Sequence, residues 1–163
     1  MQLLCVLSLF VALVPGPQAA APKAPAKAPA AAPAAKGGRT IELTGGDDMK
    51  YNLTKIEAKP GETLHVVLKS TGAIPKMAMA HNFVLLKLGA DAVEFNKASM
   101  TAAATDYVPE TLKAQVVGAT KMAGPGETVE VTFKVPPKAG SYPYMCTFPG
   151  HYAAGMKGDL VVQ

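Results

Sequence analysis

Apolar and polar residues alternate in short runs through much of the chain. Residues 127–135 show this best, because Val129, Val131, Phe133 and Val135 alternate with polar or charged residues. A period of two predicts a strand with one buried and one exposed face. Similar runs predict strands at residues 40–43, 63–69, 82–88, 115–117, 141–146 and 159–162.

Glycine- and proline-rich turns, such as Gly45-Gly46 and Gly124-Pro125-Gly126, separate these runs. Many short strands at this spacing predict an all-β fold, an antiparallel β-sandwich with Greek-key connections. Residues 91–104 are the exception, because they are rich in Ala and follow Asp91, a suitable helix N-cap. We expect them to form one helical insert outside the sandwich.

The N-terminal part of the chain has a different composition. Residues 1–19 carry no charge, and their apolar run is shorter than the ~20 residues needed to span a bilayer. We interpret them as a signal peptide, so the protein is expected to be periplasmic or otherwise exported. Residues 20–38 consist of Ala, Pro and Lys and end in two glycines, which predicts a disordered linker. Residues 39–163 then form the domain.

Charge and cysteine content narrow the function. Three of the 16 basic residues, Lys23, Lys27 and Lys36, lie in the linker, so residues 39–163 hold 13 basic and 12 acidic residues. This near-neutral domain shows no basic patch for nucleic acid. Cys5 lies in the signal peptide, which leaves Cys146 as the single cysteine of the mature chain. A lone thiol in an oxidising compartment is explained if a metal occupies it.

The candidate chemistry lies near the C-terminus. Cys146, His151 and Met156 fall within eleven residues, in a loop between the last two predicted strands. A further nitrogen ligand must come from His65 or His81, the two remaining histidines. His65 lies in mid-strand, where a core or edge histidine is the simpler interpretation. His81 follows a loop and opens a strand, a position that can hold a ligand rigidly.

This donor set indicates copper. Two imidazoles and a thiolate with a distant thioether suit an ion that cycles between Cu(I) and Cu(II). Zinc would bind the same residues but could do no redox work.

The motif from Cys146 to His151, with Met156 downstream and the run from His81 to Leu85 upstream, resembles the azurin family of blue-copper proteins, the cupredoxins. The resemblance implies a cupredoxin β-sandwich with one type 1 copper ion. It implies that the equatorial ligands are His81, Cys146 and His151, that Met156 is a weak axial ligand, and that the Ala80 carbonyl is a distant one.

The resemblance also implies a hydrogen-bond network around the sulfur. Backbone N–H groups of Asn82 and Phe148 would donate to Cys146, and the Asn82 side chain would join the two ligand segments through Thr147.

The sequence departs from the azurin pattern in three ways. Four residues, Tyr152 to Gly155, separate the last histidine from Met156, as in plastocyanin-like and auracyanin-like loops, where azurins have three. The mature chain lacks the cysteines for the N-terminal disulfide common in azurins. Ser70 stands where azurins often carry a histidine near the site.

These observations favour an electron carrier over an enzyme. Copper oxidases and nitrite reductases need several more histidines, and only His65 would remain. The alternative is a copper-storage or copper-delivery protein. We expect a monomer, without a transmembrane helix in the mature protein, that exchanges electrons with a redox partner such as a c-type cytochrome or a terminal reductase. The expected contact surface is an apolar rim around His151, made from Met79, Phe148, Pro149, Ala153, Ala154 and Met122, whereas Met77 and Met145 are expected to fill the core.

Overall fold

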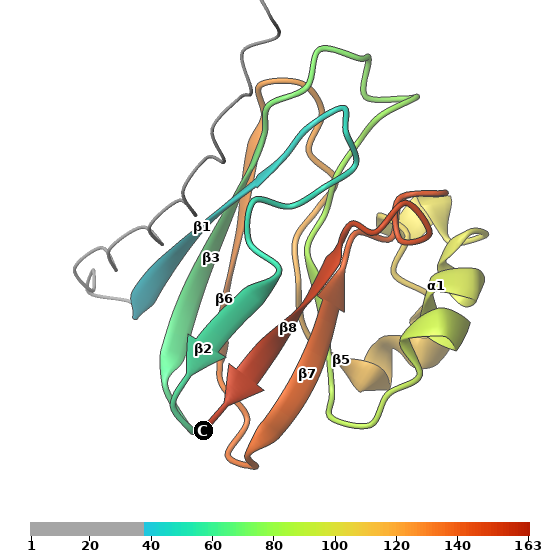
Figure 1. Cartoon of the computed structure of the whole chain (residues 1–163). Helices are drawn as coiled ribbons and strands as arrows, with labels where there is room; N and C mark the ends of the chain where they lie inside the picture. Colours follow the sequence, from blue (N-terminus) through green and yellow to red (C-terminus); the bar gives the residue numbers. More distant parts are fainter. Residues whose placement is uncertain (1–37) are drawn as a thin grey trace, which may run out of the picture. The chain divides into compact units, whose positions relative to one another are not determined.

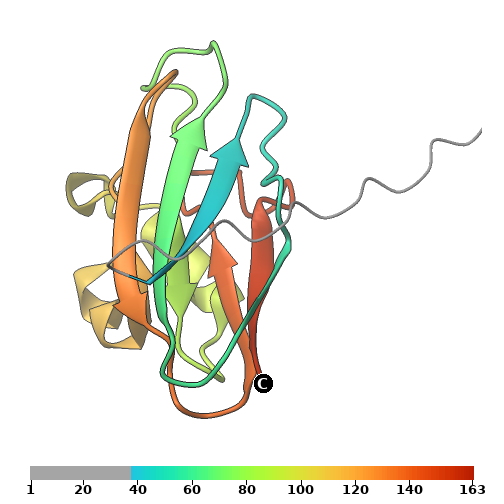
Figure 2. The same ribbon diagram turned by 90° about the vertical axis from the view of Figure 1, so that its left-hand side faces the viewer.

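The computed structural model describes residues 38–163, so the predicted signal peptide and nearly all of the predicted linker lie outside the described residues. Two β-sheets form a sandwich (Figures 1 and 2). The three-stranded sheet contains β1 (Arg39–Gly45), β3 (Thr63–Ser70) and β6 (Thr128–Lys134), in that order. The five-stranded sheet contains, in order, β2 (Lys55–Ala58), β8 (Lys157–Val162), β7 (Gly140–Met145), β4 (Val84–Leu86) and β5 (Val116–Ala119). The predicted fold class is confirmed.

The expectation of a wholly antiparallel sandwich was wrong in two places. β1 pairs with β3 in parallel, and β2 pairs with β8 in parallel. The chain leaves the first sheet after β1, forms β2 in the other sheet, and returns to form β3 beside β1. The crossover restores the original direction, so the two strands are parallel. Strand β2 was not predicted, because its four residues offer only two buried apolar positions, Ile56 and Ala58.

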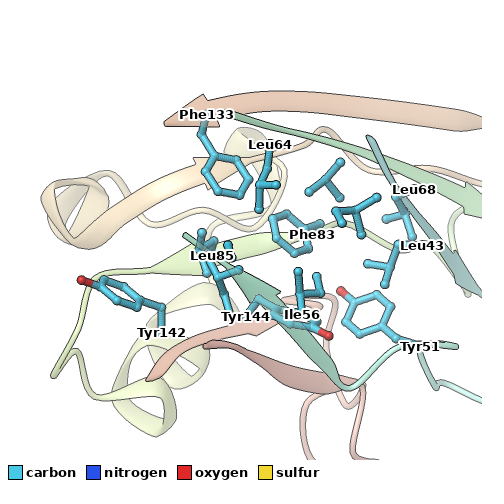
Figure 3. Packing of buried hydrophobic residues seen from close by; sticks show 14 of the residues in the cluster. Leu43, Tyr51, Ile56, Leu64, Leu68, Phe83, Leu85, Phe133, Tyr142 and Tyr144 are labelled. Atoms are coloured by element: carbon cyan, nitrogen blue, oxygen red, sulfur yellow. The ribbon is translucent and has the colours of Figure 1, made fainter. Parts of the chain in front are cut away.

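The main core lies between the sheets (Figure 3). Alternation places Leu64, Val66 and Leu68 of β3 in it, each fully buried. Phe83 stacks on Phe133 of the opposite sheet, with their ring centroids 6.3 Å apart. The two layers are therefore joined by large side chains directly behind the ligand-bearing end of β4.

A helical insert covers the outer face of the five-stranded sheet (Figure 1). Helix α1 (Ala92–Ser99) begins at Asp91, whose carboxylate accepts from the backbone N–H groups of Val93 and Glu94. The helix ends earlier than predicted, where the Met100 N–H donates to the Lys97 carbonyl, three residues back, and so leaves the α-helical hydrogen-bond pattern. The 3₁₀ helices Ala103–Thr105 and Glu110–Gln115 follow.

The insert explains why β4 is apolar on both faces. Val84 and Leu86 pack against Phe95 of α1, whereas Leu85 faces the sandwich core. Among residues 38–163, none of the helices has the length and apolar character required to cross a membrane.

Candidate metal centre

Strand pairing brings the predicted ligand segments together at one end of the sandwich. β4 and β7 are antiparallel neighbours, with Val84 opposite Met145. His81 precedes β4 and Cys146 follows β7, so the two residues meet at the same end of this strand pair. His81 is itself held by a two-way backbone bridge to Ala123. The loop from Cys146 to Met156 (red in Figure 1) lies at the opposite end of β8 from the C-terminus.

Three of the predicted residues form one buried cluster. The donor atoms of His81, Cys146 and His151 all lie within 4.8 Å of one another, the only such histidine, cysteine or carboxylate group among residues 38–163. The Cys146 Sγ is 3.4 Å from the His151 Nδ1, and the two imidazole centroids are 5.0 Å apart. The exposed fractions of the three residues are 0%, 0% and 2%, so water is nearly excluded.

Met156 and the Ala80 carbonyl border this cluster. The Ala80 oxygen is 3.9 Å from the Cys146 Sγ. Met156 is fully buried, and its carbonyl accepts from the Cys146 N–H at 3.0 Å. The four-residue spacer forms a single tight turn, because Met156 N–H donates back to the His151 carbonyl at 2.9 Å and Gly155 adopts a left-handed φ of 97°.

Gly45 is a site residue that the sequence interpretation missed. A Cβ at this position would lie 2.5 Å from the Met156 Cε and 3.2 Å from the His81 Cγ. Both side chains therefore pack directly on the backbone at the end of β1. The Gly45-Gly46 pair was interpreted as a turn signal, and nothing in the local sequence shows that side chains far along the chain pack against Gly45.

The expected link between the ligand segments is confirmed. The Asn82 amide donates to the Thr147 Oγ1 at 2.8 Å and accepts from the Thr147 N–H at 2.9 Å. Backbone N–H groups of Asn82 and Phe148 hydrogen-bond to the Cys146 sulfur. These contacts join the two ligand segments.

Burial disfavours charge on each of the three side chains of the cluster. Burial raises the pKa of the Cys146 thiol to about 12, although the two N–H donors act in the opposite direction. Burial, with a smaller effect of the neighbouring His81, lowers the pKa of His151 to about 4. Burial also lowers the pKa of His81, whereas the negative charges of Asp47 and Asp48 act in the opposite direction. Both imidazoles are therefore neutral donors, and a thiolate here needs a cation beside it.

The unsatisfied atoms of His81 fit a metal ion. Both of its ring nitrogens are buried and have no hydrogen-bond partner. Buried polar atoms are normally paired, so an unpaired imidazole beside a thiol indicates a missing partner. One thiolate and two neutral imidazoles in a closed, dry pocket suit a single copper ion.

The other histidine lies elsewhere. His65 is on β3, on the outer face of the three-stranded sheet, and its Nε2 is 2.9 Å from the Glu130 Oε2. His65 thus lies outside the cluster, as expected, although it is neither in the core nor on an edge strand, because β3 is the central strand of its sheet. Ser70 is buried at the end of the same strand.

Two expectations about methionines were wrong. Met77 is 97% exposed and so does not fill the core, because it lies in the loop between β3 and β4 with no second layer above it. Met122 is 6% exposed and contributes little to a surface rim. Met145 is fully buried, as expected, but beneath the helical insert.

A β-sandwich with a buried cluster of two histidines and one cysteine at one end defines the chain as a cupredoxin. Residues 39–163 match the family described as copper binding proteins, plastocyanin/azurin family, and the chain belongs to that family.

Its relatives agree with this. The chain is 36% identical to auracyanin-A of Chloroflexus aurantiacus over 126 residues, which cover 76% of this chain and 74% of the relative. It is 36% identical to azurin of Bordetella pertussis over 124 residues, which cover 74% of this chain and 81% of the relative.

A solved structure of the reduced auracyanin of Roseiflexus castenholzii has a TM-score of 0.68 at 34% identity, covering 76% of this chain and 96% of the other. The family, these relatives and the histidine–cysteine–histidine cluster point to blue-copper electron transfer.

Proposed function

We propose that this protein is an exported type 1 blue-copper electron carrier, in which His81, Cys146 and His151 bind one copper ion. Met156 would be a further, weaker ligand, and the Ala80 carbonyl, 3.9 Å from the Cys146 Sγ, would be a distant one. The observation that carries the proposal is the buried cluster of three donors, all within 4.8 Å of one another. A bound copper ion supplies one-electron redox chemistry.

The residues around the cluster do the remaining work. The N–H donors from Asn82 and Phe148 stabilise the charge on the Cys146 sulfur, which tunes the reduction potential. The Asn82–Thr147 hydrogen bonds hold the two ligand segments at a fixed separation. A rigid site rearranges little when the charge of its ion changes, and this is what a fast carrier requires.

Electron exchange would occur at the loop surface around His151. His151 is itself 2% exposed, so partners must touch the residues around it. Pro149 and Ala153 are exposed, and Met79, Phe148 and Ala154 are half-buried. This apolar rim suits brief contact with a redox protein, such as a c-type cytochrome or a terminal reductase. The protein would act as a monomeric electron carrier and would have no enzymatic activity of its own.

The visible spectrum of the copper-loaded protein tests the proposal. An intense blue sulfur-to-copper charge-transfer band is expected, and Cys146→Ser should abolish it while the sandwich still folds. His65→Gln is the matched control and should leave the band unchanged, because His65 lies outside the cluster. A colourless Cu(II) protein, or a blue Cys146→Ser variant, would contradict the assignment.

Copper content and colour of a further variant distinguish the electron carrier from the alternative, a copper-storage or copper-delivery protein. Such a protein would use exposed, exchangeable donors, and among residues 38–163 Met77 is an exposed methionine close in sequence to His81. Met77→Leu should leave copper content and colour unchanged if the buried cluster binds the ion. Loss of copper in this variant would favour delivery.

A further inference from the structure

The segment between the two 3₁₀ helices has an unusual backbone. Asp106 and Tyr107 are adjacent, and both adopt left-handed conformations, with φ of 54° and 59°. Asp tolerates this region, but a bulky Tyr rarely adopts it. Strained residues persist where surrounding contacts hold them, and they gather at functional sites. The contacts of this Asp106–Tyr107 corner therefore show what it holds.

Asp106 contacts the segment that carries His81. Its carbonyl accepts from the Asn82 Nδ2 at 2.9 Å, and its Oδ1 accepts from the Met122 N–H at 3.1 Å. The other end of the Asn82 amide, its own Oδ1, accepts from the Thr147 N–H at 2.9 Å. A carbonyl can only accept and a backbone N–H can only donate, so these two groups fix which way the Asn82 amide points.

Tyr107 contacts the segment that carries His151. Its ring meets Phe148 in an edge-to-face arrangement, with centroids 5.4 Å apart and planes at 62°. Phe148 in turn lies against the His151 imidazole, with centroids 4.8 Å apart. Three rings therefore form a continuous series from the helical insert to the metal centre.

We propose that the Asp106–Tyr107 corner is a positioning element of the metal centre. The Asp106 carbonyl orients Asn82, and the Tyr107 ring presses Phe148 against His151. The helical insert then has a role beyond covering the sheet, because it fixes both ligand segments from outside. The inference rests on the proposed function to the extent that His151 is taken as a copper ligand.

Three substitutions at Tyr107 separate the ring from the backbone. Tyr107→Phe keeps the ring, Tyr107→Ala removes the ring and keeps the strained backbone, and Tyr107→Gly removes the ring and relieves the strain. The readout is the rate at which a Cu(I)-specific chelator extracts copper from the reduced full chain. We expect copper extraction from Tyr107→Phe to match the wild-type rate. Extraction from Tyr107→Ala and Tyr107→Gly should be equally fast, about three- to tenfold faster than from the wild type.

Unfolding temperature provides the comparison with a merely structural role. Gly should unfold at a higher temperature than Ala, because it adopts the left-handed conformation freely. The positioning role is contradicted if the extraction rates follow the order of stability, with copper leaving Tyr107→Gly more slowly than Tyr107→Ala. It is also contradicted if both variants release copper at the wild-type rate. Should Tyr107→Ala not fold, Tyr107→Gly should still lose copper faster than Tyr107→Phe, and equal rates in these two variants would overturn the inference.

A second readout needs no copper. In the apoprotein, the NMR signals of the His151 ring should be sharp in the wild type and in Tyr107→Phe, and broadened in Tyr107→Ala and Tyr107→Gly. Unchanged signals in both ring-less variants would overturn the inference. A wild type without the blue band would instead overturn the proposed function, and the apoprotein signals would still decide whether the corner positions His151.

Discussion

At the scale of single residues, the metal centre depends on how closely side chains approach one another. Three of its residues are fully buried, namely Cys146, His81 and Met156. Water therefore cannot fill a gap or replace a contact that a substitution removes. Protein interiors are packed as densely as organic crystals, and small changes of volume are felt. Substitutions here should therefore change the copper site as well as the stability of the fold.

Met156→Leu tests the axial position. It removes a soft thioether and keeps a side chain of similar volume, so the fold should be little affected. Copper should stay bound and blue, and the reduction potential should rise, because Cu(II) loses more from the missing donor than Cu(I) does. Cyclic voltammetry measures the change. An equal or lower potential would mean that the spacer of four residues holds Met156 too far from the ion.

Gly45→Ala tests the close packing behind the site. The added methyl would collide with the Met156 Cε and crowd His81. We expect a loss of about 1–3 kcal/mol in the free energy of unfolding, together with a shifted absorption spectrum. Gly46→Ala is the control, since its Cβ would meet only the side-chain oxygens of Thr71 and Asp48, at 3.2 and 3.3 Å. Urea unfolding and the visible spectrum check both variants, and equal effects would contradict the argument.

At the scale of elements, α1 should influence stability more than copper chemistry. Asp91→Ala removes the carboxylate that accepts from the Val93 and Glu94 N–H groups. The expected loss is about 1 kcal/mol in the free energy of unfolding, measured with urea, and Asp91→Asn should retain most of the stability. The blue band should be unchanged, because the hydrogen bonds of the Asp91 carboxylate go to the first turn of α1. A changed band would show that α1 and the site are coupled more directly.

At the scale of the whole molecule, the near-neutral domain implies docking through apolar contact. Ala153→Asp places a charge on the exposed rim next to His151 and should slow electron self-exchange about tenfold or more, with spectrum and potential nearly unchanged. Changing Lys23, Lys27 and Lys36 together to Gln should have little effect on this rate. NMR line broadening in mixtures of the two oxidation states measures it. If the linker variant is the slower one, docking is electrostatic.

The sequence by itself predicted every strand except β2, and it predicted the candidate donor set. Alternation in β3 and β6 is visible because one face of each strand packs against the core. The burial pattern of β3 follows the alternation residue by residue, whereas in β6 only Phe133 is fully buried. The spacing from Cys146 to Met156 is local, so the motif could be identified without a structure. His81 could be preferred to His65 from its place between a loop and a strand, although their separation in space could not be seen.

Only the tertiary structure decided the parallel pairing of β1 with β3, the packing against Gly45 and the contacts of Asp106 and Tyr107. Each joins residues far apart in the chain, and no local pattern encodes such a contact. The exposure of Met77 was misjudged for the same reason, since an apolar residue is buried only if another element covers it. Local periodicity sets which elements form, whereas long-range packing sets which atoms meet at the metal centre.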